Sequence, residues 1–143
     1  MKAENTTRIQ FDSLSINEAY ARGAAAAFLA RYDPTVPQLA DLKTAVSEAV
    51  TNCIVHAYKQ SIGIIQLKCR ILPGGVLDIV VKDRGCGIED VAQARKPMFS
   101  TGGEERSGMG FTIMESFMTD LEISSAPGKG TSVHMRRKLQ RKQ

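Results

Sequence analysis

The middle of the chain alternates apolar and polar residues, which is the period-two pattern of half-buried strands. One run places four apolar residues on the same face: Ile65, Leu67, Cys69 and Ile71. After the turn sequence at 73–75, a second run places three more on the core side: Leu77, Ile79 and Val81. Alternation also marks strands at 8–11, around 121–125 and around 131–137. The pattern therefore predicts five strands, and the second and third should form a hairpin.

Two capping boxes mark helices between the first strand and the hairpin. In a capping box, a Ser or Thr side chain and a Glu or Gln three residues later satisfy free amides of the first turn. The box Ser15–Glu18 opens an alanine-rich helix that should stop before Asp33. The box Thr35–Gln38, with a proline in its first turn, opens a helix that should run to about Tyr58.

A glycine-rich stretch with little periodicity, at 85–110, separates the hairpin from a third helix that should end at Met118. The order of elements is then β-α-α-β-β-loop-α-β-β, with hairpins in place of alternating βα units. This order predicts an α+β fold: a two-layer sandwich with a mostly antiparallel sheet and helices on one face. A length of 143 residues suits one domain spanning 1–143, with a basic tail at 136–143.

Composition places the chain among ordinary soluble proteins, because 43% of its residues are hydrophobic and 24% are charged. No apolar run approaches the roughly 18 residues of a membrane span, and the N-terminus lacks the apolar stretch of a secretory signal. We therefore expect a cytoplasmic protein with no membrane partner. The cysteines, Cys53, Cys69 and Cys86, form no CxxC pair and are interpreted as reduced thiols.

The net charge of +4 does not by itself indicate a nucleic-acid partner. Five of the 19 basic residues lie at 136–143, which leaves 14 basic against 15 acidic groups in the rest of the chain. A short basic run at a chain end is usually a solvated segment. We therefore expect no direct DNA binding.

Asp83 falls on the core-facing side of its strand, where an ionised carboxylate is unfavourable unless donors reach it. Thr131 enters the same layer at the start of the last strand. An adenine ring, whose exocyclic amine is a donor, could lie against both residues. Glycines at Gly85 and Gly87 would let the backbone approach such a ring. The alternative is a carboxylate that caps a turn or a nearby amide.

The second helix carries a polar pair opposite its apolar stripe. At about 100° per residue, Glu48 and Asn52 lie roughly 40° apart on the helix surface, one turn from each other. The stripe itself contains seven residues: Leu39, Leu42, Val46, Ala49, Val50, Cys53 and Ala57. The pair is either functional or an ordinary part of a solvated face.

The sequence RKPMFSTGGEERSGMG, at 95–110, ends at the start of the predicted third helix. Free backbone amides at a glycine-rich helix N-terminus suit phosphate oxygens, and Arg106 immediately precedes them. The triplet GMG alone is a weak signal. Together with Asp83 and Asn52 it fits an adenine nucleotide whose phosphates run from Asn52 toward 108–110.

Four segments, EAVTNCIVHAY, DRGCG, MFSTG…GMG and GKGTSV, resemble the N, G1, G2 and G3 boxes of the ATPase superfamily that contains gyrase, histidine kinases and MutL. The resemblance spans the whole chain and is greatest to the anti-sigma factor serine kinases of sporulation. The segments SEAVTN, DPT and ERSGMGFTIMESFM are specific to that group. No P-loop GxxxxGK[ST] is present, so the commoner ATP-binding loop is not used.

The resemblance implies a role for individual residues. Asp83 would contact the adenine amine, with Thr131 assisting through water, and Asn52 would hold Mg²⁺. Arg106 would stabilise the terminal phosphate, and Glu48 would act as the catalytic base. Arg22 matches a position used for partner contact. The resemblance also implies a lid at about 95–107 that orders on nucleotide; it is rich in glycine, and Lys96 is its nearest lysine. The implied nucleotide contacts are Asn52, Asp83, Gly85, Gly87, Ser100, Thr101, Ser107, Gly108, Met109, Gly110 and Thr131.

The resemblance also implies a switch. A homodimer, joined through the sheet edge near the first strand, would hold a sigma factor of the sigma F type inactive when ATP is bound. It would phosphorylate an anti-anti-sigma factor on serine with Mg-ATP. Three alternatives stay open: a general-stress anti-sigma serine kinase, a detached histidine-kinase ATP domain, and a non-catalytic module that senses ATP and ADP.

Overall fold

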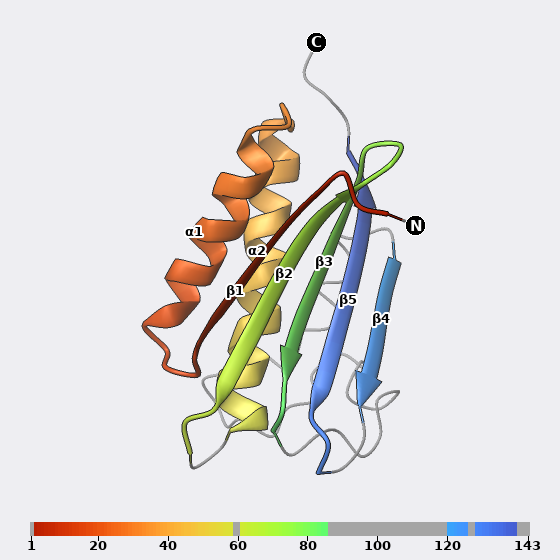
Figure 1. Cartoon of the computed structure of the whole chain (residues 1–143). Helices are drawn as coiled ribbons and strands as arrows, with labels where there is room; N and C mark the ends of the chain where they lie inside the picture. Colours follow the sequence, from red (N-terminus) through yellow and green to blue (C-terminus); the bar gives the residue numbers. More distant parts are fainter. Residues whose placement is uncertain (1, 59–60, 86–119, 126–127, 140–143) are drawn as a thin grey trace.

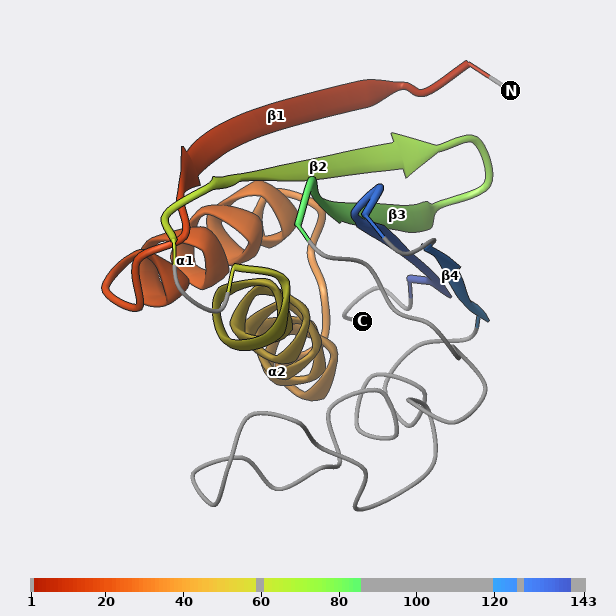
Figure 2. The same ribbon diagram turned by 90° about the horizontal axis from the view of Figure 1, so that it is seen from below.

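The computed structural model describes residues 2–58, 61–85, 120–125 and 128–139. Its elements are β1 (Asn5–Asp12), α1 (Asn17–Ala30), α2 (Val36–Asn52), the π-helical turn η1 (Cys53–Ala57), β2 (Ile64–Leu72), β3 (Val76–Asp83), β4 (Asp120–Ser125) and β5 (Thr131–Lys138). The strands form one antiparallel sheet in the order β1-β2-β3-β5-β4. Helices α1 and α2 lie together against one face (Figures 1 and 2). The predicted α+β two-layer fold is confirmed; the third helix falls outside the described residues.

The core lies between the sheet and the two helices. Inward residues of the hairpin, such as Ile65, Ile79 and Val81, are fully buried, as the alternation predicted. They pack against the apolar stripe of α2, in which Leu42, Val46, Ala49, Val50 and Cys53 are buried. No helix in the described ranges is long and apolar enough to cross a membrane.

The two predicted capping boxes have different outcomes. At α2, the Gln38 amide donates to Thr35 Oγ1 over 3.2 Å and the Gln38 side chain accepts from the Thr35 amide, so this box is confirmed. At α1, Ile16 is the N-cap and no side chain caps the helix, so the Ser15–Glu18 box is wrong. The physical reason is that Ile16 already has helical dihedral angles, and backbone carbonyls accept from the amides of Asn17 and Glu18.

The predicted basic tail is part of the sheet over its first three residues. Arg136, Arg137 and Lys138 belong to β5, in which Arg136 and Lys138 are exposed and Arg137 is partly buried. Arg137 points toward the helices, and its Nη1 lies 2.7 Å from Asp41 Oδ2 on α2. The Arg137–Asp41 ion pair therefore joins the sheet to helix α2.

Candidate functional site

Asp83 ends β3 with its side chain directed into the core, and only 4% of the residue is exposed. Its Oδ1 accepts hydrogen bonds from the backbone amides of Gly85, at 2.9 Å, and Thr131, at 3.2 Å. Backbone donors therefore reach this carboxylate without a ligand, so the turn-capping alternative is correct in part. The cause is local: Asp83 and Thr131 are opposite each other at the ends of β3 and β5, and Gly85 follows Asp83 by two residues, which is the spacing of a side-chain turn cap.

Cys53 brings the end of helix α2 to the same carboxylate. Burial, the negative charge of Asp83 and a hydrogen bond to Asp83 raise the pKa of the Cys53 thiol well above its ordinary value. The thiol therefore stays protonated and donates to Asp83. Because Cys53 directly follows Asn52, this contact places the start of η1 next to the end of β3.

An ionised carboxylate offers about four acceptor positions on its two oxygens. Two amides and one thiol occupy three of them at Asp83. The site therefore retains capacity for one further donor, such as the exocyclic amine of a purine. That donor would enter a position already surrounded by groups that hold the carboxylate in place.

Thr131 lies directly opposite Asp83 in the β3–β5 register, so the structure brings this predicted pair together. Its Oγ1 lies 2.8 Å from Ser125 Oγ on β4, and Ser125 Oγ donates to the Gly130 carbonyl. Gly130 has a φ of +83°, and a Cβ there would lie 2.3 Å from the Asp83 carbonyl oxygen. Only glycine permits this approach, so the GKG turn holds Thr131 beside Asp83.

Tyr58 is a site residue that the sequence reasoning missed. Its hydroxyl accepts from the Arg84 amide at 2.7 Å and donates to the Ile64 carbonyl at 2.9 Å. A Cβ on Gly63 would lie 2.2 Å from the tyrosine ring, so a glycine at that position makes room for the ring. The phenol therefore fixes the backbone immediately after Asp83. The one signal in the sequence is an aromatic residue at the helix end with a glycine five residues later.

Glu48 and Asn52 both lie in the second half of α2 and are partly exposed. Their α-helical spacing holds, since α2 continues to Asn52 and becomes a π-helical turn at Cys53. Such π-turns often occur at functional sites. The turn begins directly after Asn52.

The remaining predicted residues have different placements. Gly85 is described and donates its amide to Asp83. Arg22 is on α1, half-buried, with its Nε 3.7 Å from Glu18 Oε1. Eight predicted positions lie outside the described residues: Gly87, Ser100, Thr101, Arg106, Ser107, Gly108, Met109 and Gly110. In the described ranges, no group of three His, Cys, Asp or Glu residues is placed to hold a metal ion.

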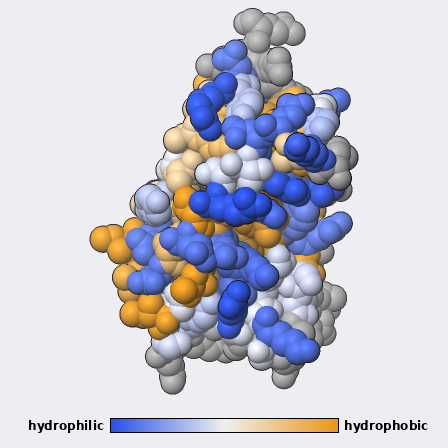
Figure 3. Space-filling model, viewed as in Figure 1, coloured by the Kyte–Doolittle hydropathy of each residue, from blue (hydrophilic) through white to orange (hydrophobic). Residues whose placement is uncertain are grey.

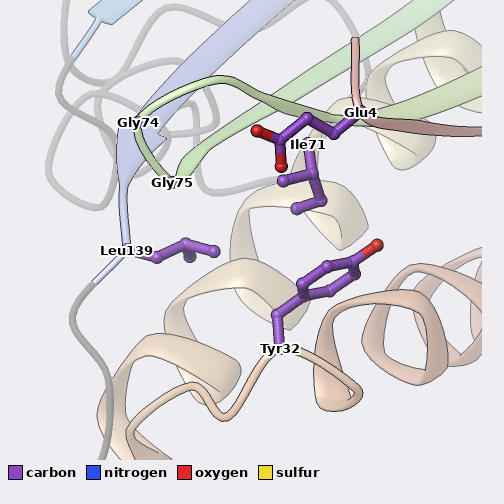
Figure 4. Close-up of a pocket in the computed structure, with 6 residues that line it drawn as sticks. All are labelled: Glu4, Tyr32, Ile71, Gly74, Gly75 and Leu139. Carbon is purple, nitrogen blue, oxygen red and sulfur yellow. The ribbon is translucent and has the colours of Figure 1, made fainter.

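A pocket of about 420 Å³ opens at the other end of β3, beside the β2–β3 turn (Figure 4). Its lining includes Glu4, Tyr32, Ile71 and Leu139. Asp83 and Thr131 do not line it, so this pocket is separate from the candidate site.

Comparison with known proteins identifies the family. The model of the histidine kinase-like ATPase domain matches residues 13–137. The anti-sigma F factor of Caldanaerobacter subterraneus is 54% identical over 136 residues, covering 94% of each chain. The anti-sigma F factor of Bacillus licheniformis is 47% identical over 138 residues, covering 95% of this chain and 94% of the other.

Solved structures support the fold. The RsbU and RsbW domains of a Mycobacterium tuberculosis protein match with a TM-score of 0.70 and 20% identity, covering 96% of this chain and 33% of that one. The mycobacterial sensor histidine kinase MprB matches with a TM-score of 0.59 and 14% identity, covering 94% of this chain and 100% of that one. By its sequence relatives and its domain, the chain belongs to the histidine kinase-like ATPase family and, within it, to the anti-sigma F factors.

Proposed function

We propose that the protein is an ATP-dependent serine kinase that inhibits a sporulation sigma factor of the sigma F type when ATP is bound. The observation that carries the proposal is the buried carboxylate of Asp83, held by Cys53 and by the Thr131 amide, with acceptor capacity to spare. Adenine presents a donor at its exocyclic amine. The family supports a nucleotide at this position.

Mg²⁺ fits the donor set to a limited extent. This cation commonly uses one or two protein ligands and takes its other oxygens from substrate phosphates and water. Asn52 supplies one amide oxygen. Asp83 already accepts hydrogen bonds from backbone amides, and we assign its remaining acceptor capacity to the adenine base. We therefore assign Mg²⁺ to Asn52, where the ion would neutralise phosphate charge.

Glu48 is the proposed general base. It lies one helical turn before Asn52, so it would face a serine hydroxyl presented to the terminal phosphate. A base at that position takes the hydroxyl proton as the oxygen attacks phosphorus. Arg106 and the amides at 108–110 are proposed to stabilise the phosphates, in keeping with the resemblance of their sequence.

The partners follow from the family. Relatives bear the name anti-sigma F factor, so we propose a sigma F type partner that contacts Arg22 on α1. An anti-anti-sigma factor would be the serine acceptor. Strand β1 lies at an edge of the sheet, which leaves its outer backbone groups available for the proposed homodimer.

The proposal is tested with γ-labelled ATP, Mg²⁺ and a purified anti-anti-sigma factor. We expect label on serine of the acceptor, and retention of a purified sigma F type factor with ATP but not with ADP. Label on histidine would instead support a histidine kinase. Sigma binding without any labelled product would indicate a sequestering module and contradict the kinase assignment.

A further inference from the structure

The sheet has a second face, opposite the helices, which no described element covers (Figures 1 and 2). By alternation with the inward residues, the β3 side chains on this face are those of Asp78, Val80 and Lys82. Their neighbours across the sheet include Arg70 and Lys68 on β2 and Arg136 on β5. Hydrophilic side chains extend across this face in Figure 3, which has the same orientation as Figure 1.

Asp78 lies at the centre of this open face and yet is fully buried, at 0% exposure. Its Oδ2 accepts from Arg70 Nε at 2.8 Å, and its Oδ1 accepts from Arg136 Nε at 2.8 Å. His134 also contacts Oδ1. The carboxylate is therefore covered by basic side chains rather than by another layer of the fold.

This arrangement pre-organises two guanidinium groups. Each is held through its Nε edge by one carboxylate between them, so less side-chain entropy is lost when they bind an anion. The side chain of Arg136 remains 44% exposed and that of Arg70 22%. Asp120 on β4 lies opposite Arg136 in the register, so Arg70 is the arginine of this pair that lies farther from the acids of β4.

A second group of cations lies beside this cluster, without a matching acid. Arg8 on β1 and Lys68 on β2 are directly opposite in the register, and Lys82 is on the same face of β3. Like charges directly opposite on neighbouring strands destabilise a sheet. Within the part of the chain that the structure describes, neither Arg8 nor Lys68 forms an ion pair. A bound carboxylate would relieve this repulsion.

We propose that the open face of the sheet is a docking surface for an acidic segment of a partner protein, carrying two to four carboxylates. The contact set is Arg8, Lys68, Arg70, Lys82 and Arg136. Strands lie about 4.8 Å apart, so the patch from β1 to β5 is roughly 15 Å wide, which suits a short segment. Guanidinium groups recognise carboxylates through paired hydrogen bonds.

The chemistry of the face favours protein over nucleic acid. No aromatic side chain occupies an outward position of the described strands, so the face lacks the stacking platforms that bind single strands. A second copy of this chain would bring its own basic face against this one, and the like charges oppose that pairing.

The docking surface is separate from the nucleotide site. Asp83 and Thr131 point to the helix side of the sheet, whereas Lys68, Lys82 and Arg136 point to the other side. A partner on the open face would leave the proposed nucleotide site uncovered. The proposal therefore does not depend on the kinase assignment.

The test uses the full chain and a fluorescein-labelled twelve-residue peptide of four Ser-Glu-Ser repeats, which carries four glutamates, followed by anisotropy in about 50 mM NaCl. Lys68→Glu is compared with Lys43→Glu, which makes the same charge change at an exposed position on α2. We expect Lys68→Glu to weaken peptide binding at least tenfold and Lys43→Glu to change it less than threefold. Lys68→Glu should also keep or raise the Tm, because the new carboxylate would pair with Arg8.

Equal peptide binding by the two variants would overturn the proposal. So would tight binding of a twelve-residue oligothymidine in place of the peptide, since the face would then be a nucleic-acid site. A fall in Tm for Lys68→Glu, measured without peptide, would show that the fold already compensates the repulsion between Arg8 and Lys68. It would contradict the claim that these two cations need a bound carboxylate. Loss of binding with an unchanged or higher Tm supports the docking surface.

Discussion

Thr131 lies directly opposite Asp83 on the neighbouring strand, and its backbone amide donates to Asp83 Oδ1 over 3.2 Å. The amide of Gly85 reaches the same oxygen, and the Cys53 thiol also donates to the carboxylate. The end of α2, the end of β3 and the start of β5 therefore meet at one buried acid. Changes at any of these three elements should alter the position of that carboxylate.

Gly130→Ala should destabilise the protein by more than about 1 kcal/mol, because alanine is strained at positive φ and its Cβ would collide with the Asp83 carbonyl. Gly128→Ala is the matched control, since it has a φ of +75° but nothing within 4 Å of the added Cβ. Urea unfolding measures both. Equal losses would show that backbone strain alone, rather than the close approach to β3, decides the outcome.

Tyr58→Phe should cost about 0.5–1.5 kcal/mol of unfolding free energy and should weaken adenine nucleotide binding. The phenylalanine keeps the ring but leaves the Arg84 amide without its hydroxyl partner. Tyr20→Phe serves as the control, because Tyr20 is 55% exposed. Chemical denaturation and calorimetry on both variants separate the two effects. Nucleotide affinity that is unchanged in Tyr58→Phe would limit Tyr58 to a structural role.

Asp78→Ala should cost about 3–5 kcal/mol near neutral pH, since it removes the buried carboxylate that Arg70 and Arg136 both contact. Burial alone would raise the pKa of Asp78, but hydrogen bonds from His134, Arg136 and Arg70 outweigh burial and lower the pKa from 3.8. The folded state therefore holds its proton less tightly than the unfolded state. The stabilisation by Asp78 should be complete above about pH 5 and decline as the pH falls below 3.8 toward the lowered value.

Urea unfolding of the wild type and Asp78→Ala at several pH values measures this difference. The two free energies should converge in acid and stay parallel above about pH 5. A gap that widens as the pH falls would contradict the assignment of an ionised Asp78 in the folded protein.

Glu48→Gln should lower the rate of phosphoryl transfer about 10²- to 10⁴-fold and leave ATP affinity nearly unchanged, because glutamine cannot accept the serine proton. Single-turnover transfer of labelled phosphate, with calorimetry for ATP, measures both quantities. A rate within about threefold of the wild type would remove Glu48 from the role of base.

Local pattern was sufficient for the strands and the α2 capping box, since each depends on spacing within a short segment. Alternation also placed Asp83 and Thr131 on the core-facing side of their strands, whereas their pairing across β3 and β5 arises in the assembled sheet. The last strand was predicted at about 131–137, and β5 extends one residue further, to Lys138. Partners distant in sequence were not predictable in the same way. Tyr58 binds the Arg84 amide, and Asp78 is buried by Arg136, through contacts that only the assembled sheet creates.

The central claim is that Asp83 recognises adenine, and calorimetry of ATP and ADP with Asp83→Asn tests it most directly. The substituted asparagine can still accept from the two backbone amides, but its own amide group would confront the adenine amine. Affinity for both nucleotides should fall about 10- to 100-fold and by the same factor, corresponding to roughly 1–3 kcal/mol for one unsatisfied donor. Asp41→Asn, on α2 and bound to Arg137, should bind both nucleotides as the wild type does. Unchanged affinity in a folded Asp83→Asn protein would contradict the claim.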